Sequence, residues 1–333
     1  MRSWISILKM VVMNADFLSM IEYASKAPSG HNTQPWRFAL TGDGMVILPK
    51  FEVALPVVDA DNRELFISLG CALENLLISA RHFGYKARVV GCNPEGIEIR
   101  CVKDEDVAKE HLFYQIEKRQ TNRSIYDGRK LSGEVLGLFE SLPVEDNIRL
   151  YSAPVGSVFA DSLTGYIIKG NEVQMNDKAF KRELLSWMRF NAKQINGTND
   201  GLSYKVFGNP PLPKMMAKPI VRCFLKAAVQ NKADREKIKS SSHLILFTTR
   251  SNTFMEWIGL GRTLQRFLLK TTEAGVACAY LNQPCEVYAL AAEMRDLLPI
   301  NREYPTLILR IGYAKPVPYS PHKNVRELLV CHG

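Results

Sequence analysis

The sequence has 333 residues, with 46% hydrophobic and 23% charged, which indicates a globular protein that can bury a sizeable core. No stretch approaches the roughly 20 consecutive apolar residues of a membrane-spanning helix. The 43 Lys and Arg residues outnumber the 34 Asp and Glu residues, a balance of +9 that suits an anionic partner such as a phosphorylated small molecule, or a mildly basic surface without one. Because the basic residues are spread out and no nucleic-acid-binding motif accompanies them, we expect neither nucleic acid nor a membrane as partner.

The seven cysteines contain no CxxC spacing, which indicates neither a disulfide framework nor a zinc site. Cys71 and Cys278 lie in apolar runs and are expected in the core, and free thiols fit a cytoplasmic location. Residues 1–13 resemble a weak signal peptide, but Lys9 breaks their apolar run and no small-residue cleavage site follows before Asp16. We therefore expect a cytoplasmic protein and leave the role of the first dozen residues open.

Helix and strand signals alternate in the first hundred residues. The predicted elements, in chain order, are a helix at 17–26, strands at 36–40 and 45–48, an amphipathic helix at 64–83, and strands at 87–90 and 97–102. The first two strands are separated by Thr-Gly-Asp-Gly, a hairpin signal. Gly84 stands where a helix C-terminal cap is expected.

A second alternating stretch begins after residue 240. The predicted elements are a strand at 244–248, a helix at 257–274, an extended segment at 276–281, a helix at 287–297 and a strand at 307–311. Between the two stretches, Pro and Gly clusters within 184–213 make continuous regular structure unfavourable. This region reads as an inserted, lid-like segment of about 180–240, and the alternation around it predicts an α+β fold.

The two long helices resemble each other. Gly70 and Gly84 are 14 residues apart, and so are Gly261 and Gly275. The leucines at equal offsets between these glycines are Leu73 and Leu77 in the first helix and Leu264 and Leu268 in the second. The pattern favours an internal duplication, although two unrelated core helices that end at Gly would look similar.

A polar loop at 27–36 is the first candidate site. Pro and Gly place turns at both ends, five polar side chains follow one another, and Trp36 then opens a strand. The amide of Asn32 or Gln34 offers a donor and an acceptor together, which matches the edge of a pyrimidine-like ring. The alternative is a polar loop that Trp36 merely anchors.

The segment 119–123 is the second candidate site. In an extended backbone, Arg119, Thr121 and Arg123 would face the same way and surround one phosphate with two guanidinium groups and a hydroxyl. The alternative is an exposed basic turn. A weaker signal at 319–323 adds a cation that could reach the same phosphate.

Several runs together resemble the nitroreductase family. APSGHNTQPWRF is similar to that family's flavin-ring loop and RQTNR to its phosphate element. LLKTTEAGVACAYLNQPCEV, and YPTLILRIGYA followed by SPHK, are similar to its later segments. The resemblance covers roughly residues 20–125 and 243–330, and it is closest to the subgroup of single-chain, Acg-like FMN-binding oxidoreductases.

The resemblance implies a nitroreductase-like fold in which two tandem halves mimic the family's homodimer. The halves would be residues 14–110 and 111–333, and the second would carry the insertion. Each of the two site elements occurs once, so we expect one FMN site between the halves. The chain would be a monomer with dimer-like internal symmetry, and further self-association stays open.

The resemblance also implies roles for individual residues. Those expected at the FMN phosphate and ribityl chain are Arg119, Thr121, Arg123 and Lys323, with His322 where the subgroup commonly has Arg. Those expected at the isoalloxazine ring are Pro28, Ser29, Gly30, Asn32 and Gln34, together with backbone N–H groups around Leu281, Asn282 and Gln283.

The implied activity is hydride transfer from NAD(P)H through flavin N5 to a nitroaromatic, a quinone or a similar acceptor. A flavin enzyme of this kind requires no side-chain nucleophile or general base, and no HExxH, GxSxG or GxGxxG motif occurs. His31 is a candidate donor to the substrate or simply an exposed loop residue. The alternative function is an FMN-binding or sequestering protein whose insertion covers the flavin and prevents turnover.

Overall fold

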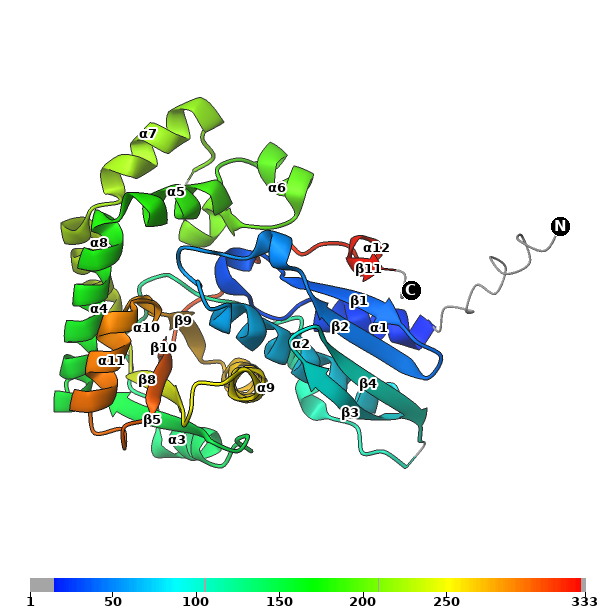
Figure 1. Cartoon of the computed structure of the whole chain (residues 1–333). Coiled ribbons are helices and arrows are strands. Elements are labelled where there is room, and N and C mark those ends of the chain that lie inside the picture. The colour runs from blue at the N-terminus through cyan, green and yellow to red at the C-terminus, as the bar shows by residue number, and fades with distance from the viewer. Residues whose placement is uncertain (1–14, 105, 209, 331–333) are drawn as a thin grey trace.

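Two β-sheets stand on either side of a central pair of long helices, and shorter helices cover one end of both (Figure 1). The computed structural model describes residues 15–330 except 105 and 209, so the leader-like residues 1–13 and Cys331 lie outside it. Within the described residues, no helix is long and apolar enough to cross a membrane. The arrangement is the α+β fold that the alternating helix and strand signals predict.

The first sheet has the strand order β11-β1-β2-β4-β3. Its strands are β1 (Trp36–Leu40), β2 (Gly44–Pro49), β3 (Tyr85–Asn93), β4 (Gly96–Lys103) and β11 (Leu329–Val330). The predicted hairpin joins β1 and β2 in antiparallel register, whereas β11 pairs with β1 in parallel. The C-terminal arm of the chain therefore returns to the sheet of the first half.

The second sheet is antiparallel throughout and has the strand order β5-β8-β10-β9. Its strands are β5 (Ile148–Pro154), β8 (His243–Thr249), β9 (Ala277–Tyr280) and β10 (Tyr304–Gly312). β8 and β10 are buried along almost their whole length, as their continuous apolar runs predict. The side chains of both sheets and of the long helices between them belong to one apolar core.

The central helices α2 (Arg63–His82) and α9 (Phe254–Glu273) cross at two glycines. A Cβ added to Gly70 would lie 2.9 Å from the Cα of Gly261 and would clash with the Ile258 carbonyl oxygen. A Cβ added to Gly261 would lie 2.8 Å from the Cα of Gly70 and would clash with the Ile67 carbonyl oxygen. The two helices thus meet backbone to backbone through equivalent residues, which only glycine permits.

The two helices also end alike. Gly84 follows α2 with a φ of 76°, and Gly275 follows α9 with a φ of 68°. This left-handed conformation costs glycine little. Strand β3 begins directly after Gly84, and β9 begins two residues after Gly275. The expected caps are therefore both present.

The insertion between β5 and β8 is helical and compact. Its elements, with the helix that leads into it, are α4 (Val158–Asn176), α5 (Lys178–Trp187), β6 (Met188–Arg189), α6 (Ala192–Thr198), β7 (Leu202–Ser203), η4 (Tyr204–Phe207), α7 (Lys214–Phe224) and α8 (Ala227–Lys239). Its apolar side chains pack against Leu55 and Val58 of the first half. The Glu183 carboxylate also accepts hydrogen bonds from the backbone N–H groups of Val57 and Val58, each at 3.0 Å. The insertion, which belongs to the second half of the sequence, is therefore tied to the first half as well.

Shorter helices complete the fold. They are α1 (Ala15–Ala24), η1 (Gly30–Asn32), η2 (Phe51–Val53), η3 (His111–Gln115), α3 (Gly133–Glu140), α10 (Gln283–Glu286), α11 (Tyr288–Leu297) and α12 (Val325–Leu328). Every helix and strand predicted outside the insertion is present within about three residues of its expected limits. The sequence prediction had no counterpart for α3, β5 and α4.

Candidate functional site

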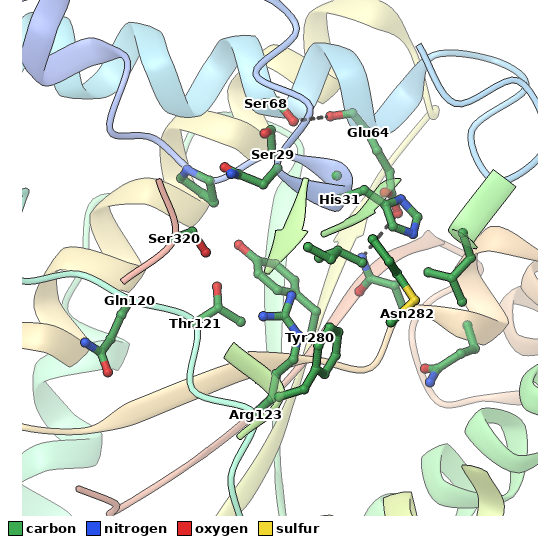
Figure 2. Close-up of a pocket in the computed structure, with 18 of the residues that line it drawn as sticks. Ser29, His31, Glu64, Ser68, Gln120, Thr121, Arg123, Tyr280, Asn282 and Ser320 are labelled. Carbon is green, nitrogen blue, oxygen red and sulfur yellow. Dashed lines mark hydrogen bonds between the residues drawn. The ribbon is translucent and has the colours of Figure 1, made fainter. Parts of the chain in front are cut away.

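A cavity of about 880 Å³ opens between the first half, the second half and the insertion. This volume lies in the range of about 300–1,000 Å³ that is common for ligand pockets. The cavity walls come from the polar loop, the segment 119–123, the first turns of α2, the connection from β9 to α10, and the insertion. Figure 2 shows polar side chains from these distant segments around one space.

The segment 119–123 contributes to one wall of the cavity. Arg119, Thr121 and Arg123 line it, as the alternation predicts, but Gln120, which the alternation places on the opposite face, lines it as well. Asn122 is buried away from it, and its backbone N–H donates to the Cys278 carbonyl oxygen at 2.9 Å. The extended backbone is thus fastened to β9, and it presents two guanidinium groups and a hydroxyl on one side.

The charges of Arg119 and Arg123 are not neutralised by any carboxylate in the described structure. Among the residues that the structure describes, neither Arg119 nor Arg123 forms an ion pair with a carboxylate. Arg119 Nη2 donates to the Lys26 carbonyl oxygen at 3.1 Å, and its buried Nε atom has no partner. Burial lowers the pKa of Arg123, and the neighbouring Arg310 lowers it further. Uncompensated buried cations are unfavourable, so this wall is suited to an anion.

The polar loop faces this wall with an unusual backbone. His31, Asn32 and Gln34 have φ values of 48°, 56° and 53°, in a backbone region that residues other than glycine rarely adopt. The Ser29 hydroxyl accepts the backbone N–H of Gln34 at 3.0 Å and so braces the turn. Pro28, Ser29, Gly30, His31 and Asn32 all line the cavity. Strain of this kind is common at ligand-binding sites.

The amide of Gln34 does not face the cavity, contrary to the expectation for a ring-binding residue. Gln34 is fully buried, its Nε2 donates to the Asn199 carbonyl oxygen at 2.7 Å, and its Oε1 accepts the Lys323 backbone N–H at 2.8 Å. Asn32 Nδ2 similarly donates to the Pro321 carbonyl oxygen at 3.0 Å, although Asn32 still lines the cavity. These amides join the loop to the insertion and to the C-terminal arm.

Two further residues of the expected site lie outside the cavity. The Lys323 ammonium is 3.7 Å from the Asp200 carboxylate, which also pairs with Arg189 of the insertion. The Leu281 backbone N–H donates a hydrogen bond to the Ile308 carbonyl oxygen at 2.9 Å, because the chain continues alongside β10 at this point. Neither group is therefore free to bind a ligand in this structure. Asn282, Gln283 and His322 do line the cavity.

The cavity lining contains buried polar atoms without partners. Burial lowers the pKa of both His31 and His322 to about 4, with Arg123 adding to the effect at His31 and Arg119 at His322. Both imidazoles are therefore neutral near pH 7. Within the described part of the chain, the lining atoms that lack a hydrogen-bond partner are His31 Nδ1, Arg119 Nε, Gln283 Oε1 and His322 Nδ1. Unpaired buried groups are costly, so their clustering here indicates a polar ligand.

The sequence reasoning missed two acidic residues in the cavity lining. Glu64 lies in the first turn of α2, and Glu286 ends α10. Burial, together with the neighbouring Glu286, raises the pKa of Glu64 to about 8, and burial also raises the pKa of Glu286. An acidic residue in the first turn of a helix is so common that it carries no functional signal.

Glu64 is predicted to make the stability of the ligand-free protein depend on pH. Its pKa is about 8 in the folded chain and 4.5 ordinarily, so between these values the folded state binds a proton that the unfolded state lacks. Stability therefore falls as pH rises through this window. Glu64→Gln removes this loss, and thermal unfolding is expected to show a variant several degrees more stable than the wild type near pH 8.5 and similar to it near pH 5. Glu140→Gln, at the exposed end of α3, is the control, and an equal shift at both pH values would contradict the assignment.

No family model matches the sequence, but individual relatives match most of it. The chain is 23% identical over 325 residues to a Mycobacterium tuberculosis protein named "Putative NAD(P)H nitroreductase". This alignment covers 93% of this chain and 90% of the relative. It is 24% identical over 323 residues to an "Uncharacterized protein" of the same organism, which covers 92% of this chain and 89% of that one. Both alignments take in nearly the whole of each chain.

Solved structures of shorter proteins also overlap with this chain. One is the FMN and NADPH-dependent nitroreductase NfnB from sphigopyxis sp. strain HMH, with 13% identity, 67% of this chain and 100% of that chain covered, and a TM-score of 0.43. Another is the FMN-dependent nitroreductase NfnB from Mycobacterium smegmatis in complex with NADPH. It is 12% identical, the match covers 60% of this chain and 86% of that chain, and the TM-score is 0.37. Both TM-scores lie below 0.5.

Proposed function

We propose that this nitroreductase-like chain is an oxidoreductase that binds one FMN in the cavity between its halves. It would take hydride from NAD(P)H and reduce a small acceptor such as a nitroaromatic or a quinone. The observation that carries the proposal is the pair of uncompensated guanidinium groups facing a strained polar loop across one cavity. The name of the mycobacterial relative supports the same activity. FMN would supply the hydride chemistry, and the protein would supply binding and orientation.

The residues present fit the phosphate end of FMN. Arg119 and Arg123 have no acidic partner among residues 15–330 as described, and Thr121 adds a hydroxyl between them. A phosphate dianion would neutralise both cations and accept charge-assisted hydrogen bonds from them. His322 is neutral near pH 7 and would contribute a hydrogen bond without charge.

The residues at the other end of the cavity fit a flat heterocycle with donors and acceptors on its edge. Ser29, Gly30 and Asn32 would contact the ring from the first half, and Asn282 and Gln283 from the second half. The unpaired Gln283 Oε1 would gain a donor there. Lys323 and Gln34 would act indirectly, by holding the loop to the insertion.

We further propose that the two halves, residues 14–110 and 111–333, arose by duplication and together replace a homodimer. The support is the helix crossing, where Gly70 and Ile67 on α2 meet Gly261 and Ile258 on α9 in the same relation. Residues of both halves line the cavity, so under this proposal one chain would suffice to form it. The C-terminal arm, which pairs β11 with β1, belongs in space to the first half.

The insertion supports a second candidate function, storage of FMN without turnover. Apolar side chains from the insertion line the cavity, among them Phe180, Met188 and Phe207. The Asp200 region is tied to the polar loop, where the Gly201 N–H donates to the Asn32 carbonyl oxygen at 3.2 Å. If the insertion covers a bound flavin in this way, a nicotinamide would reach the flavin only after this contact opens.

Anaerobic mixing of the FMN-loaded protein with NADH or NADPH separates the two functions. We expect the flavin absorbance to bleach and to return when a quinone is added. Persistent absorbance with both nucleotides, despite stoichiometric FMN, would establish the storage function. Purified protein that neither contains nor takes up FMN would contradict both.

A further inference from the structure

We propose that Arg310 is a positioning residue of the phosphate site: it holds the segment 119–123 from behind and adds a third positive charge to the two that line the cavity. This inference rests on the proposed binding of FMN and assigns to it a residue that does not touch the ligand. Arg310 lies on β10 and is not among the residues that line the cavity. It is the one charged residue within the apolar strand segment 307–311, where a cation is unusual.

The guanidinium group of Arg310 is bonded to the backbone on both sides of Arg123. Its Nη2 donates to the Ser124 carbonyl oxygen at 2.8 Å and to the Asn122 carbonyl oxygen at 3.3 Å. Its Nη1 donates to the Ser241 hydroxyl at 3.5 Å. Because the two carbonyl groups flank Arg123, holding both of them fixes the backbone from which the Arg123 side chain extends into the cavity (Figure 2).

Tyr126 orients Arg310 and supports the same backbone. Its ring centroid lies 4.0 Å from the guanidinium carbon of Arg310, and its hydroxyl donates to the Asn122 carbonyl oxygen at 3.0 Å. The ring fits against β10 because Gly312, on the same face of the strand two residues after Arg310, has no side chain. A Cβ added to Gly312 would lie 2.9 Å from Tyr126 Cδ2. The planar guanidinium is thus held in one orientation.

The charge of Arg310 is buried without an ion pair. Arg310 is 1% exposed, and in the part of the chain that the structure describes it forms no ion pair with a carboxylate. Asp234 acts on it from beyond ion-pair distance, and that carboxylate is itself paired with Lys237 at 3.2 Å. An unpaired buried cation is costly. An anion bound at Arg119 and Arg123 would therefore offset the charge of three cations rather than two.

The phosphate site consequently has two layers. Arg119, Thr121 and Arg123 form the front layer and would donate hydrogen bonds to the ligand. Arg310 forms the back layer and would act through the position of the segment and through its charge. A dianionic phosphate ester gains from both effects, whereas a neutral ring without a phosphate gains from neither. Arg310 should therefore affect the affinity for FMN much more than the affinity for riboflavin.

Titration of the FMN-free protein with FMN and with riboflavin tests this difference. Arg310→Gln removes the charge and keeps an amide donor, and we expect its preference for FMN over riboflavin to fall about 10-fold. Arg310→Lys keeps the charge, but one ammonium cannot bridge both carbonyl groups as a planar guanidinium does, so we expect a fall of about threefold. Arg302→Gln removes an exposed arginine that is paired with Asp296, and it is the matched control without an effect.

An unchanged preference for FMN in Arg310→Gln would overturn the proposal. If that variant does not fold, an unchanged preference in Arg310→Lys would overturn it instead. A wild-type protein that fails to bind FMN at all would contradict the proposed function, and this outcome is distinct from a wild type and a Gln variant that prefer FMN equally.

Phosphorus NMR of bound FMN separates the effect of the charge from structural support. The second pKa of a phosphate monoester is about 6, and nearby cations should hold the pKa of the bound phosphate below this value. We expect the phosphate to titrate at a higher pH in Arg310→Gln than in the wild type, and to titrate as in the wild type in Arg310→Lys and Arg302→Gln. A purely structural role would weaken binding without moving this titration, so equal titration in Arg310→Gln and the wild type would overturn the proposed role of the charge.

Discussion

Replacing Arg119 and Arg123 together by alanine is expected to weaken FMN binding about 10²- to 10⁴-fold. Each guanidinium would lose charge-assisted hydrogen bonds worth about 1.5–3 kcal/mol. The lysines that line the cavity in the described part of the chain are already paired, Lys26 with Glu117 and Lys237 with Asp234, and Lys323 lies near Asp200. Titration of the FMN-free protein, followed by quenching of flavin fluorescence, measures the change in Kd.

Riboflavin distinguishes loss of a phosphate site from general damage, because it has the same ring without the phosphate. The wild type should prefer FMN strongly, and the double variant should bind both ligands with similar weak affinity. Arg100→Ala, which removes an exposed arginine of the first sheet paired with Asp43, is the matched control and should leave both affinities unchanged. An equal loss of affinity for FMN and riboflavin would show that the arginines do not hold the phosphate.

The central helices and most strands could be predicted because their signals are local. The apolar periodicity of α2 and α9 and the glycines after them are visible within one window of sequence. α4 escaped prediction because it is buried on several sides, with Gly170 and Asn171 against neighbouring elements, so no single apolar face marks it. β11 has two residues, and only its pairing with the distant β1 defines it.

In the candidate site, too, the residues with a local signal could be predicted and those that depend on distant partners could not. Alternation along five residues was enough to predict that Arg119, Thr121 and Arg123 lie on one wall of the cavity. Gln34 was misplaced because its partner Asn199 lies 165 positions away, and no local pattern shows that the amide is already occupied. Glu64 and Glu286 were missed for a related reason, since each glutamate is ordinary in its own segment and unusual only by its place in the cavity lining.

Gly70→Ala is expected to destabilise the protein by about 3 kcal/mol or more. The new methyl group would meet the backbone of α9 at Ile258 and Gly261, and a helix backbone cannot give way as a flexible side chain can. Gly261→Ala should cause a similar loss, because it would meet α2 at Ile67 in the same manner. The midpoint and slope of urea unfolding measure both changes.

Gly137→Ala is the matched control, because Gly137 lies in the exposed interior of α3 with nothing within 4 Å of an added Cβ. There the alanine should stabilise the protein by about 0.5–1 kcal/mol, since glycine is the poorer helix former. Since Gly70 and Gly261 share one contact, the double variant should lose less than the sum of the two single losses. Full additivity, or a loss at Gly137 as large as at Gly70, would show that the crossing is not a single close contact.

The same helix crossing positions the polar loop of the first half opposite the segment 119–123, which is bonded to β9. Gly261→Ala should therefore weaken FMN binding even at temperatures where the variant remains folded.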